Sequence, residues 1–174
     1  MTLYERITTK PGYRLLLVLA LAVTMMNLDF IWEEEQQKAA PVVVESRPQT
    51  AQEAKYEQFF RKHNSPAPKQ MAQAVMKAKT PRKRLLASVA VVESNGNPAA
   101  KGKAGEKGAW QIIEREWGTV PPAHRPDLQA DQATIILEQL IKDSNGNLRQ
   151  ALCRYNGDRS GAYSAKVMRK VAQL

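Results

Sequence analysis

The sequence predicts an all-α domain that follows an N-terminal membrane helix and a tether. Three observations predict this class. Several segments in the C-terminal part of the chain carry apolar residues at helical spacing. Groups of Gly, Asn or Pro separate these segments. No alternation of apolar and polar residues marks a convincing strand. A length of 174 residues allows one ordinary domain with appendages.

The expected helices follow one another through residues 69–174, which we assign to the folded domain. Thr80 is expected to cap the second helix, with Pro81 at its first helical position. The long helix at 127–144 is amphipathic, and its apolar face is expected to point inward. That face consists of Ala133, Ile136, Leu137, Leu140 and Ile141. The other helices are expected at residues 69–79, 81–93, 110–117 and 148–155, and a last one runs towards the C-terminus.

A membrane-spanning segment is expected near the N-terminus. Residues 15–26 are almost unbroken apolar sequence, and the run can be extended to residue 32. Basic residues precede it and three Glu residues follow it, which predicts an N-terminus inside and the rest of the chain outside. We expect a cytoplasmic tail at 1–14 and a single-pass signal anchor at 15–32 in the inner membrane, with the domain in the periplasm or outside. A cleaved signal peptide is the competing interpretation.

Residues 33–68 have the composition of a tether, because they are rich in Pro, Gln and charged residues and show little apolar periodicity. A short helix is expected within them at residues 51–62. Its aromatic residues, Tyr56, Phe59 and Phe60, lie on one side. They either dock onto the domain or belong to a loose amphipathic segment, and the sequence leaves both possibilities open.

Composition limits the partners of the chain. Lys and Arg number 26 and Asp and Glu number 17, so the net charge is +9. This balance suits nucleic acid, a membrane surface or an acidic polymer, without choosing among them. Cys153 is the only cysteine, so an internal disulfide is excluded. Because the chain has only two His and one Cys, we expect no zinc site, and we expect no other cofactor.

Glu93 is the first candidate for chemistry. It follows an apolar, helix-forming run at residues 85–92, and a Ser-Asn-Gly-Asn-Pro turn comes directly after it. Burial among apolar side chains would raise the pKa of the carboxyl group, and a protonated carboxylic acid can donate a proton to a leaving oxygen. The alternative is a solvated glutamate on a surface helix. Taken alone, Glu93 favours that alternative, because exposed glutamates are common.

Three short segments, each at a helix end or a turn, extend this picture. They are Glu93-Ser94-Asn95, Gly108-Ala109-Trp110-Gln111 and Arg154-Tyr155-Asn156-Gly157. In order and spacing they resemble the catalytic Glu-Ser, the Gly-Leu-Met-Gln and the Ala-Tyr-Asn segments of the soluble lytic transglycosylase-like (SLT) family. That family is a branch of the lysozyme-like fold related to goose-type lysozymes. The resemblance covers residues 85–174 and includes Asn97-Pro98 after the Glu-Ser pair.

The resemblance implies that the substrate is cell-wall peptidoglycan, cut between N-acetylmuramic acid and N-acetylglucosamine. Glu93 would protonate the glycosidic oxygen and then act as base towards the muramyl C6 hydroxyl, which closes a 1,6-anhydro ring. One carboxyl group suffices when the substrate supplies the nucleophile. A hydrolytic muramidase and a non-catalytic peptidoglycan-binding module are the alternatives. A nucleic-acid binder is not favoured, because no nucleic-acid motif accompanies the charge and the domain is expected to be exported. Beyond the glycan strands and the inner membrane, a secretion or envelope-spanning assembly is a further possible partner.

The resemblance also implies roles for the residues around Glu93, and each has a structural alternative. Ser94 would hydrogen-bond substrate or order the end of the helix. Gly108 would permit close backbone approach or be an ordinary loop glycine. Gln111 would bind an acetamido group or a sugar hydroxyl, or be a surface amide. Tyr155 would donate to the Glu93 carboxylate or be a core tyrosine. Asn156 lies in the same substrate-binding segment, although a role in fixing the turn is favoured.

Two tryptophans and one further acid complete the candidates. Trp110 stands inside the second motif, where the family has Met, and we expect its ring to be a platform for a sugar. Trp117 is expected in the core. Glu114 would make true hydrolysis possible if it faced the cleft as a water-activating base. The favoured alternative is a solvated helix face.

Overall fold

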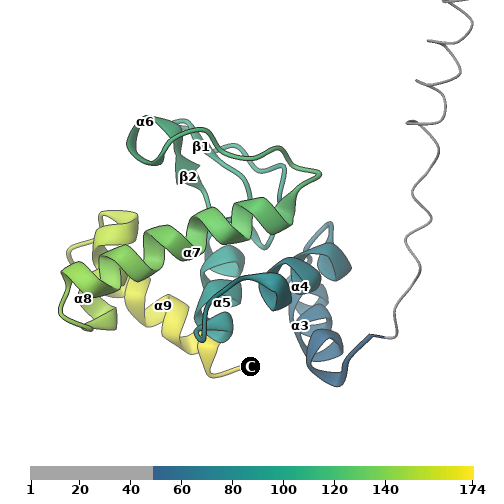
Figure 1. Ribbon diagram of the computed structural model, residues 1–174. Coiled ribbons are helices and arrows are strands. Elements are labelled where there is room, and N and C mark those ends of the chain that lie inside the picture. Colours follow the sequence, from purple (N-terminus) through teal and green to yellow (C-terminus); the bar gives the residue numbers. More distant parts are fainter. Residues whose placement is uncertain (1–48) are drawn as a thin grey trace, which may run out of the picture. The chain divides into compact units, whose positions relative to one another are not determined.

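A computed structural model describes residues 49–174, and Figure 1 shows how the elements of this part are arranged. The expected tail at 1–14 and anchor at 15–32 lie outside the described residues. Of the helices in residues 49–174, none combines the length and the apolar character needed to cross a membrane. The described part contains seven α-helices and one two-stranded antiparallel sheet. In chain order the elements are α3 (Ala51–Lys62), α4 (Pro68–Lys77), α5 (Lys83–Ser94), β1 (Glu106–Lys107), β2 (Ile112–Ile113), α6 (Glu114–Trp117), α7 (Pro126–Asp143), α8 (Leu148–Asn156) and α9 (Ala162–Val171).

Helix α5 is the central element of the domain. Its residues from Leu85 to Val91 are all buried, as expected for a helix that is apolar on every side. Helix α9 packs against it, and α4 and α7 also contact it. The helix starts at Lys83, two residues later than the expected start at Pro81. The Thr80 hydroxyl accepts a bond from the Arg82 backbone N–H at 2.9 Å and donates one to Glu138 at 2.9 Å, so Thr80 closes a turn before the helix.

Helix α7 has the expected position and orientation. It contacts α4 and α8, and Figure 1 shows it running across the domain between them. The five residues predicted to point inward are all buried. The amphipathic pattern of this helix therefore predicted its packing correctly, because a periodic apolar face leaves only one favourable orientation on the core.

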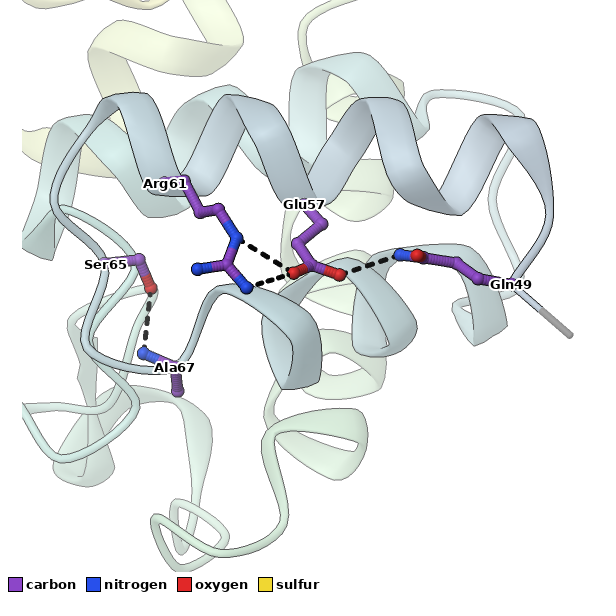
Figure 2. A network of polar contacts seen from close by, with 5 residues as sticks. All are labelled: Gln49, Glu57, Arg61, Ser65 and Ala67. Atoms are coloured by element: carbon purple, nitrogen blue, oxygen red, sulfur yellow. Dashed lines mark hydrogen bonds and ion pairs between the residues drawn. The ribbon is translucent and has the colours of Figure 1, made fainter. Parts of the chain in front are cut away.

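Helix α3 belongs to the folded unit and not to a tether. Tyr56, Phe59 and Phe60 are at most 5 % exposed, and α3 packs along α4. Of the two possibilities left open by the sequence, docking onto the domain is the one observed. The compact unit starts at Pro48, so the domain boundary predicted at residue 69 is too late. Glu57 of α3 accepts hydrogen bonds from Gln49 and Arg61, as Figure 2 shows.

The segment predicted as a helix at 110–117 is in fact a hairpin strand followed by one helical turn. Strand β2 pairs with β1 in the register Glu106↔Ile113 and Lys107↔Ile112, and the helical turn α6 comes only afterwards. Gln111 has a φ of 49°, which lies in the left-handed region and interrupts a helix at this point. Gly118 ends α6.

Candidate active site

Glu93 lies in the last turn of α5, and the local sequence explains why the helix ends beside it. Asn95 adopts a left-handed φ of 56°, and its N–H bonds to the carbonyl of Val91 at 3.0 Å. The N–H of Gly96 bonds to the carbonyl of Ala90 at 3.0 Å. This pattern is the usual way in which Asn and Gly close a helix. It leaves the Glu93 carboxyl group half-buried at the end of the apolar helix.

The carboxyl group of Glu93 is held by two side chains from other helices. The Tyr163 hydroxyl in α9 donates to Oε1 at 2.5 Å, and the Asn156 side chain at the end of α8 also hydrogen-bonds the carboxyl group. Burial raises the pKa of Glu93 above its usual value, and the negative charge of Glu106 adds to this effect. The two hydrogen bonds and the charge of Lys166 act in the opposite direction but do not cancel the rise. This is the environment of a general acid.

Tyr155 does not donate to Glu93, so that part of the prediction is wrong. Its hydroxyl donates instead to the backbone carbonyl of Trp110 at 2.7 Å. The donor to Glu93 is Tyr163, which lies outside the three motifs. Its placement is set by Asp158, whose carboxylate accepts a bond from the Tyr163 backbone N–H at 2.7 Å at the start of α9. The spacing of Tyr163 and Val167, four residues apart on the buried face of α9, is the sequence signal that could have identified it.

Ser94 orders the end of α5, which is one of its two expected roles. Its hydroxyl donates to the carbonyl of Ala109 at 2.8 Å and accepts from the N–H of Asn97 at 3.0 Å. The first bond connects the turn after Glu93 to the Gly-Ala-Trp-Gln segment. A contact between Ser94 and substrate stays a prediction.

A glycine is required at position 108 because the Gln129 side chain packs against its Cα. Its φ is 75°, and a Cβ built on it would lie 2.6 Å from Oε1 of Gln129. The Gln129 side chain is only 1 % exposed. It accepts from the N–H of Ala109 at 3.1 Å and donates to the carbonyls of Pro98 and Pro121 at 3.0 and 2.9 Å. Gln129 was not a candidate from the sequence. The signal that could have identified it is the position of a Gln on the inner side of an amphipathic helix.

Gln111 lies on the same side of the hairpin as Glu106. A Cβ on Gly102 would approach both Glu106 Oε2, at 2.1 Å, and Gln111 Oε1, at 2.8 Å, so these two side chains converge over Gly102. The amide nitrogen of Gln111 donates to the Gly108 carbonyl at 2.9 Å. Because Glu106 in turn influences the pKa of Glu93, the three side chains share one region. Glu106 was not a candidate from the sequence, because it precedes the Gly108-Ala109-Trp110-Gln111 segment and is not part of it.

Neither tryptophan lies where the sequence predicted it. Trp110 is 0 % exposed, and its indole N–H donates to the carbonyl of Leu86 at 2.9 Å. Its ring is therefore part of the core and not a platform for a sugar. Trp117 is 39 % exposed, so the prediction that it lies in the core is also wrong.

Glu114 has a structural role. One carboxylate oxygen pairs with the Lys107 ammonium at 2.5 Å, and the other accepts from the N–H of Val120 at 3.0 Å. The bond from Lys107 lowers the pKa of Glu114. A carboxylate with both oxygens engaged is poorly suited to activate water, so the structure does not favour Glu114 as a second catalytic base. Within residues 49–174, no group of three or more His, Cys, Asp or Glu side chains is placed to hold a metal ion.

A comparison with protein families agrees with this geometry. The model of the transglycosylase SLT domain matches residues 70–169, which is more than half of the chain. The chain belongs to this family. The match contains Glu93, Gln111, Tyr155 and Tyr163, whereas α3 precedes it. Neither a curated protein nor a solved structure matches the chain. Membership assigns a lysozyme-like helical domain and, at the level of the family, transglycosylase-type activity on peptidoglycan.

Proposed function

We propose that this SLT-family domain is a lytic transglycosylase that cleaves the bond between N-acetylmuramic acid and N-acetylglucosamine, with Glu93 as its single catalytic carboxyl group. One observation carries the proposal: Glu93 is half-buried at a helix end, has a raised pKa and receives a 2.5 Å bond from Tyr163. An acid that stays protonated towards neutral pH can protonate a leaving sugar oxygen.

The reaction needs one proton to move out and one to return. Protonated Glu93 donates to the glycosidic oxygen as the bond from that oxygen to muramyl C1 breaks. The muramyl C6 oxygen then attacks C1, and Glu93 takes the C6 hydroxyl proton, which restores the acid. The products are a new 4-hydroxyl end and a 1,6-anhydromuramyl end, and no water is consumed. The proximity of the C6 hydroxyl on the same sugar replaces the nucleophile of a two-carboxylate enzyme.

Substitution of Glu93 tests the proposal. We expect Glu93→Gln to release no muropeptides from purified sacculi, because an amide cannot donate the proton. Mass spectrometry of the wild-type products should show 1,6-anhydromuropeptides. Full activity of Glu93→Gln would remove Glu93 from the mechanism, and a wild-type protein that releases no soluble product would favour the non-catalytic binding module.

The stability of Glu93→Gln supplies the folding control. The pKa of Glu93 is higher in the folded protein than in the unfolded chain. Such a group stabilises the fold at pH values below its pKa in the unfolded chain, and this stabilisation is lost as pH rises through its pKa in the folded protein. The amide has no charge to bury. We therefore expect Glu93→Gln to be at least as stable as wild type at neutral pH, with the difference vanishing below about pH 4. Thermal unfolding at both pH values measures this.

Glu106 gives one specific reason to keep a muramidase as the second candidate. It is a second carboxylate near Glu93, and one of its oxygens accepts from the N–H of Ala104 at 2.9 Å. A hydrolase with Glu106 as the water-activating base would yield reducing ends, and Glu106→Gln would abolish them. A transglycosylase would still form anhydro ends after this substitution.

For the location of the domain we propose the arrangement expected from the sequence, a single-pass anchor at residues 15–32 with the domain in the periplasm or outside. The apolar run and the flanking charges support it. The net charge of +9 suits an anionic wall polymer. Alkaline extraction of membranes should leave the full-length protein in the pellet. Release of a shortened protein would indicate a cleaved signal peptide instead.

A further inference from the structure

A hollow of about 340 Å³ lies beside the hairpin and does not include Glu93. One wall is formed by residues 98–101 together with Lys107 and Gly108, and the other by residues 120–123. Buried Gln129 forms part of the floor. The volume falls at the lower end of the roughly 300–1,000 Å³ that small-ligand sites occupy.

Two side chains hold the walls of this hollow together. Gln129 donates to the carbonyl of Pro98 on one wall and to the carbonyl of Pro121 on the other. Glu114 joins Lys107 on the first wall to the N–H of Val120 on the second. The hollow is thus fixed by hydrogen bonds before any ligand arrives, which reduces the ordering that binding requires.

The charge of the hollow is positive. Lys101 and Lys107 are the charged residues among those that line it. They stand directly opposite each other in an antiparallel bridge, an arrangement that destabilises a sheet when the charges are alike. Glu114 neutralises Lys107, but Lys101 has no ion-pair partner among residues 49–174. An anionic group bound between the walls would neutralise the remaining charge of Lys101.

The hollow lies on the opposite face of the hairpin from the catalytic region. Glu106 and Lys107 are successive strand residues, so their side chains point to opposite faces. Glu106 acts on Glu93, whereas Lys107 lines the hollow. Pro98 follows Glu93 by five residues, so the two Cα atoms cannot be more than about 18 Å apart. An extended tetrapeptide reaches about 14 Å. The length of a short peptide attached to a sugar near Glu93 is therefore comparable to this limit on the separation.

We propose that this hollow binds the stem peptide of peptidoglycan, a short peptide with free carboxylates and alanine side chains, and that Lys101 contacts one of the carboxylates. The Pro and Ala residues of the walls suit small methyl side chains, and the uncompensated charge of Lys101 suits a carboxylate. This inference rests on the proposed function, because a glycan strand in the catalytic region is what presents the peptide.

The first test measures binding of a purified stem tetrapeptide to the full-length protein by equilibrium dialysis. We expect saturable binding that Lys101→Glu weakens about tenfold, the order of one charge-assisted contact. Lys103→Glu is the matched control, since Lys103 is exposed in the same loop but does not line the hollow. Ala123→Trp, which fills the hollow without changing its charge, should also weaken binding.

Three results would overturn the proposal. They are the absence of saturable binding by wild type, equal effects of Lys101→Glu and Lys103→Glu, and equal affinity for a tetrapeptide whose carboxylates are amidated. Each removes either the site or its recognition of negative charge. All three variants change side chains that are exposed to solvent, so folding is expected to survive and is checked by circular dichroism.

The second test compares cleavage of glycan strands that carry peptides with strands stripped by an amidase. Wild type should prefer the peptide-bearing strands, and Lys101→Glu should lose this preference while Lys103→Glu keeps it. Equal rates of wild type on both substrates would contradict the proposal.

Equilibrium dialysis with Glu93→Gln separates the hypothesis of the peptide site from the hypothesis of the catalytic mechanism. Peptide binding by an inactive Glu93→Gln supports both. If Glu93→Gln is inactive and does not bind the peptide, only the proposal of the peptide site is overturned. If Glu93→Gln is fully active, only the proposed mechanism is overturned.

Discussion

At the scale of single residues, the protonation state of Glu93 is set by a balance between burial and hydrogen bonding. Burial is the larger effect and raises the pKa, while Tyr163 and Asn156 stabilise the charged form and lower it. The same burial and the nearby Glu93 charge raise the pKa of Tyr163, so this hydroxyl remains a donor at every pH of interest. Tyr163 therefore positions the acid and limits how far its pKa can rise.

Tyr163→Phe tests this role. The proposed mechanism requires protonated Glu93, so under it the rate should fall as pH rises through the pKa of Glu93. Removing the Tyr163 hydroxyl removes a bond that stabilises the carboxylate, which raises this pKa. We expect the descending limb of the pH–rate profile to move to higher pH, together with a lower maximal rate because the carboxyl group is less firmly held.

Tyr155→Phe is the matched control for this experiment. It also removes a tyrosine hydroxyl, eight residues earlier in the chain, but the Tyr155 hydroxyl donates to the carbonyl of Trp110 and not to Glu93. The descending limb should stay in place in this variant. Equal shifts in both variants would mean that Tyr163 has no special influence on Glu93.

At the scale of elements, α3 and the residues just after it support the turn that follows α5. The Ser65 hydroxyl, just beyond α3, donates to the carbonyl of Gly96 at 2.8 Å in a buried position. A Cβ on Gly96 would lie 2.7 Å from the ring of Phe60, so that ring packs directly on the turn. His63 also contacts Gln173 near the end of α9, at 3.1 Å. The helix that precedes the family match thus supports both helices that position the acid and its donor.

Ser65→Ala should reduce activity by more than its effect on stability explains. It leaves the Gly96 carbonyl without this partner, which costs about 1–3 kcal/mol. Thr80→Val is the control, because it removes hydroxyl bonds at the opposite end of α5. At a temperature where both variants are folded, we expect only Ser65→Ala to lower the rate on sacculi. Equal rates would show that this support stabilises the fold without positioning Glu93.

At the scale of the whole molecule, the folded unit is longer than the family match. The match begins at residue 70, whereas the compact unit begins at Pro48. The three aromatic residues of α3 belong to the same core as α5 and α7. Burying each such side chain contributes about 1.5–3 kcal/mol, and a domain has only about 5–15 kcal/mol of net stability.

Truncation tests where the domain begins. A chain that starts at residue 48 should unfold cooperatively at a temperature close to that of the full-length protein. A chain that starts at residue 69 should lose most of its stability, because the surface that α3 covers becomes exposed. Circular dichroism with heating measures both. A stable protein starting at residue 69 would show that α3 is dispensable for the fold.

The sequence by itself determined what depends on local pattern. Apolar periodicity predicted α7 and its inner face, and the Asn and Gly residues after Glu93 predicted the end of α5. The three motifs identified the family and Glu93, because the order and spacing of motifs can be read from the sequence without knowledge of the contacts. Ser94 and Gly108 were also identified, although their partners were not.

Only the tertiary structure decided which side chains meet. Tyr163 reaches Glu93 across 70 residues of sequence, and no local pattern contains such a pairing. Trp110 lies inside the core, between the two strands of the hairpin and directly before left-handed Gln111, and the Leu86 carbonyl accepts its indole N–H. The same limit applies to Gln129, which joins three distant segments, and to α3, whose short amphipathic pattern fits a docked helix and a loose one equally well. Local sequence sets backbone preference and amphipathicity, but the partner of a polar or aromatic group depends on how separate helices pack.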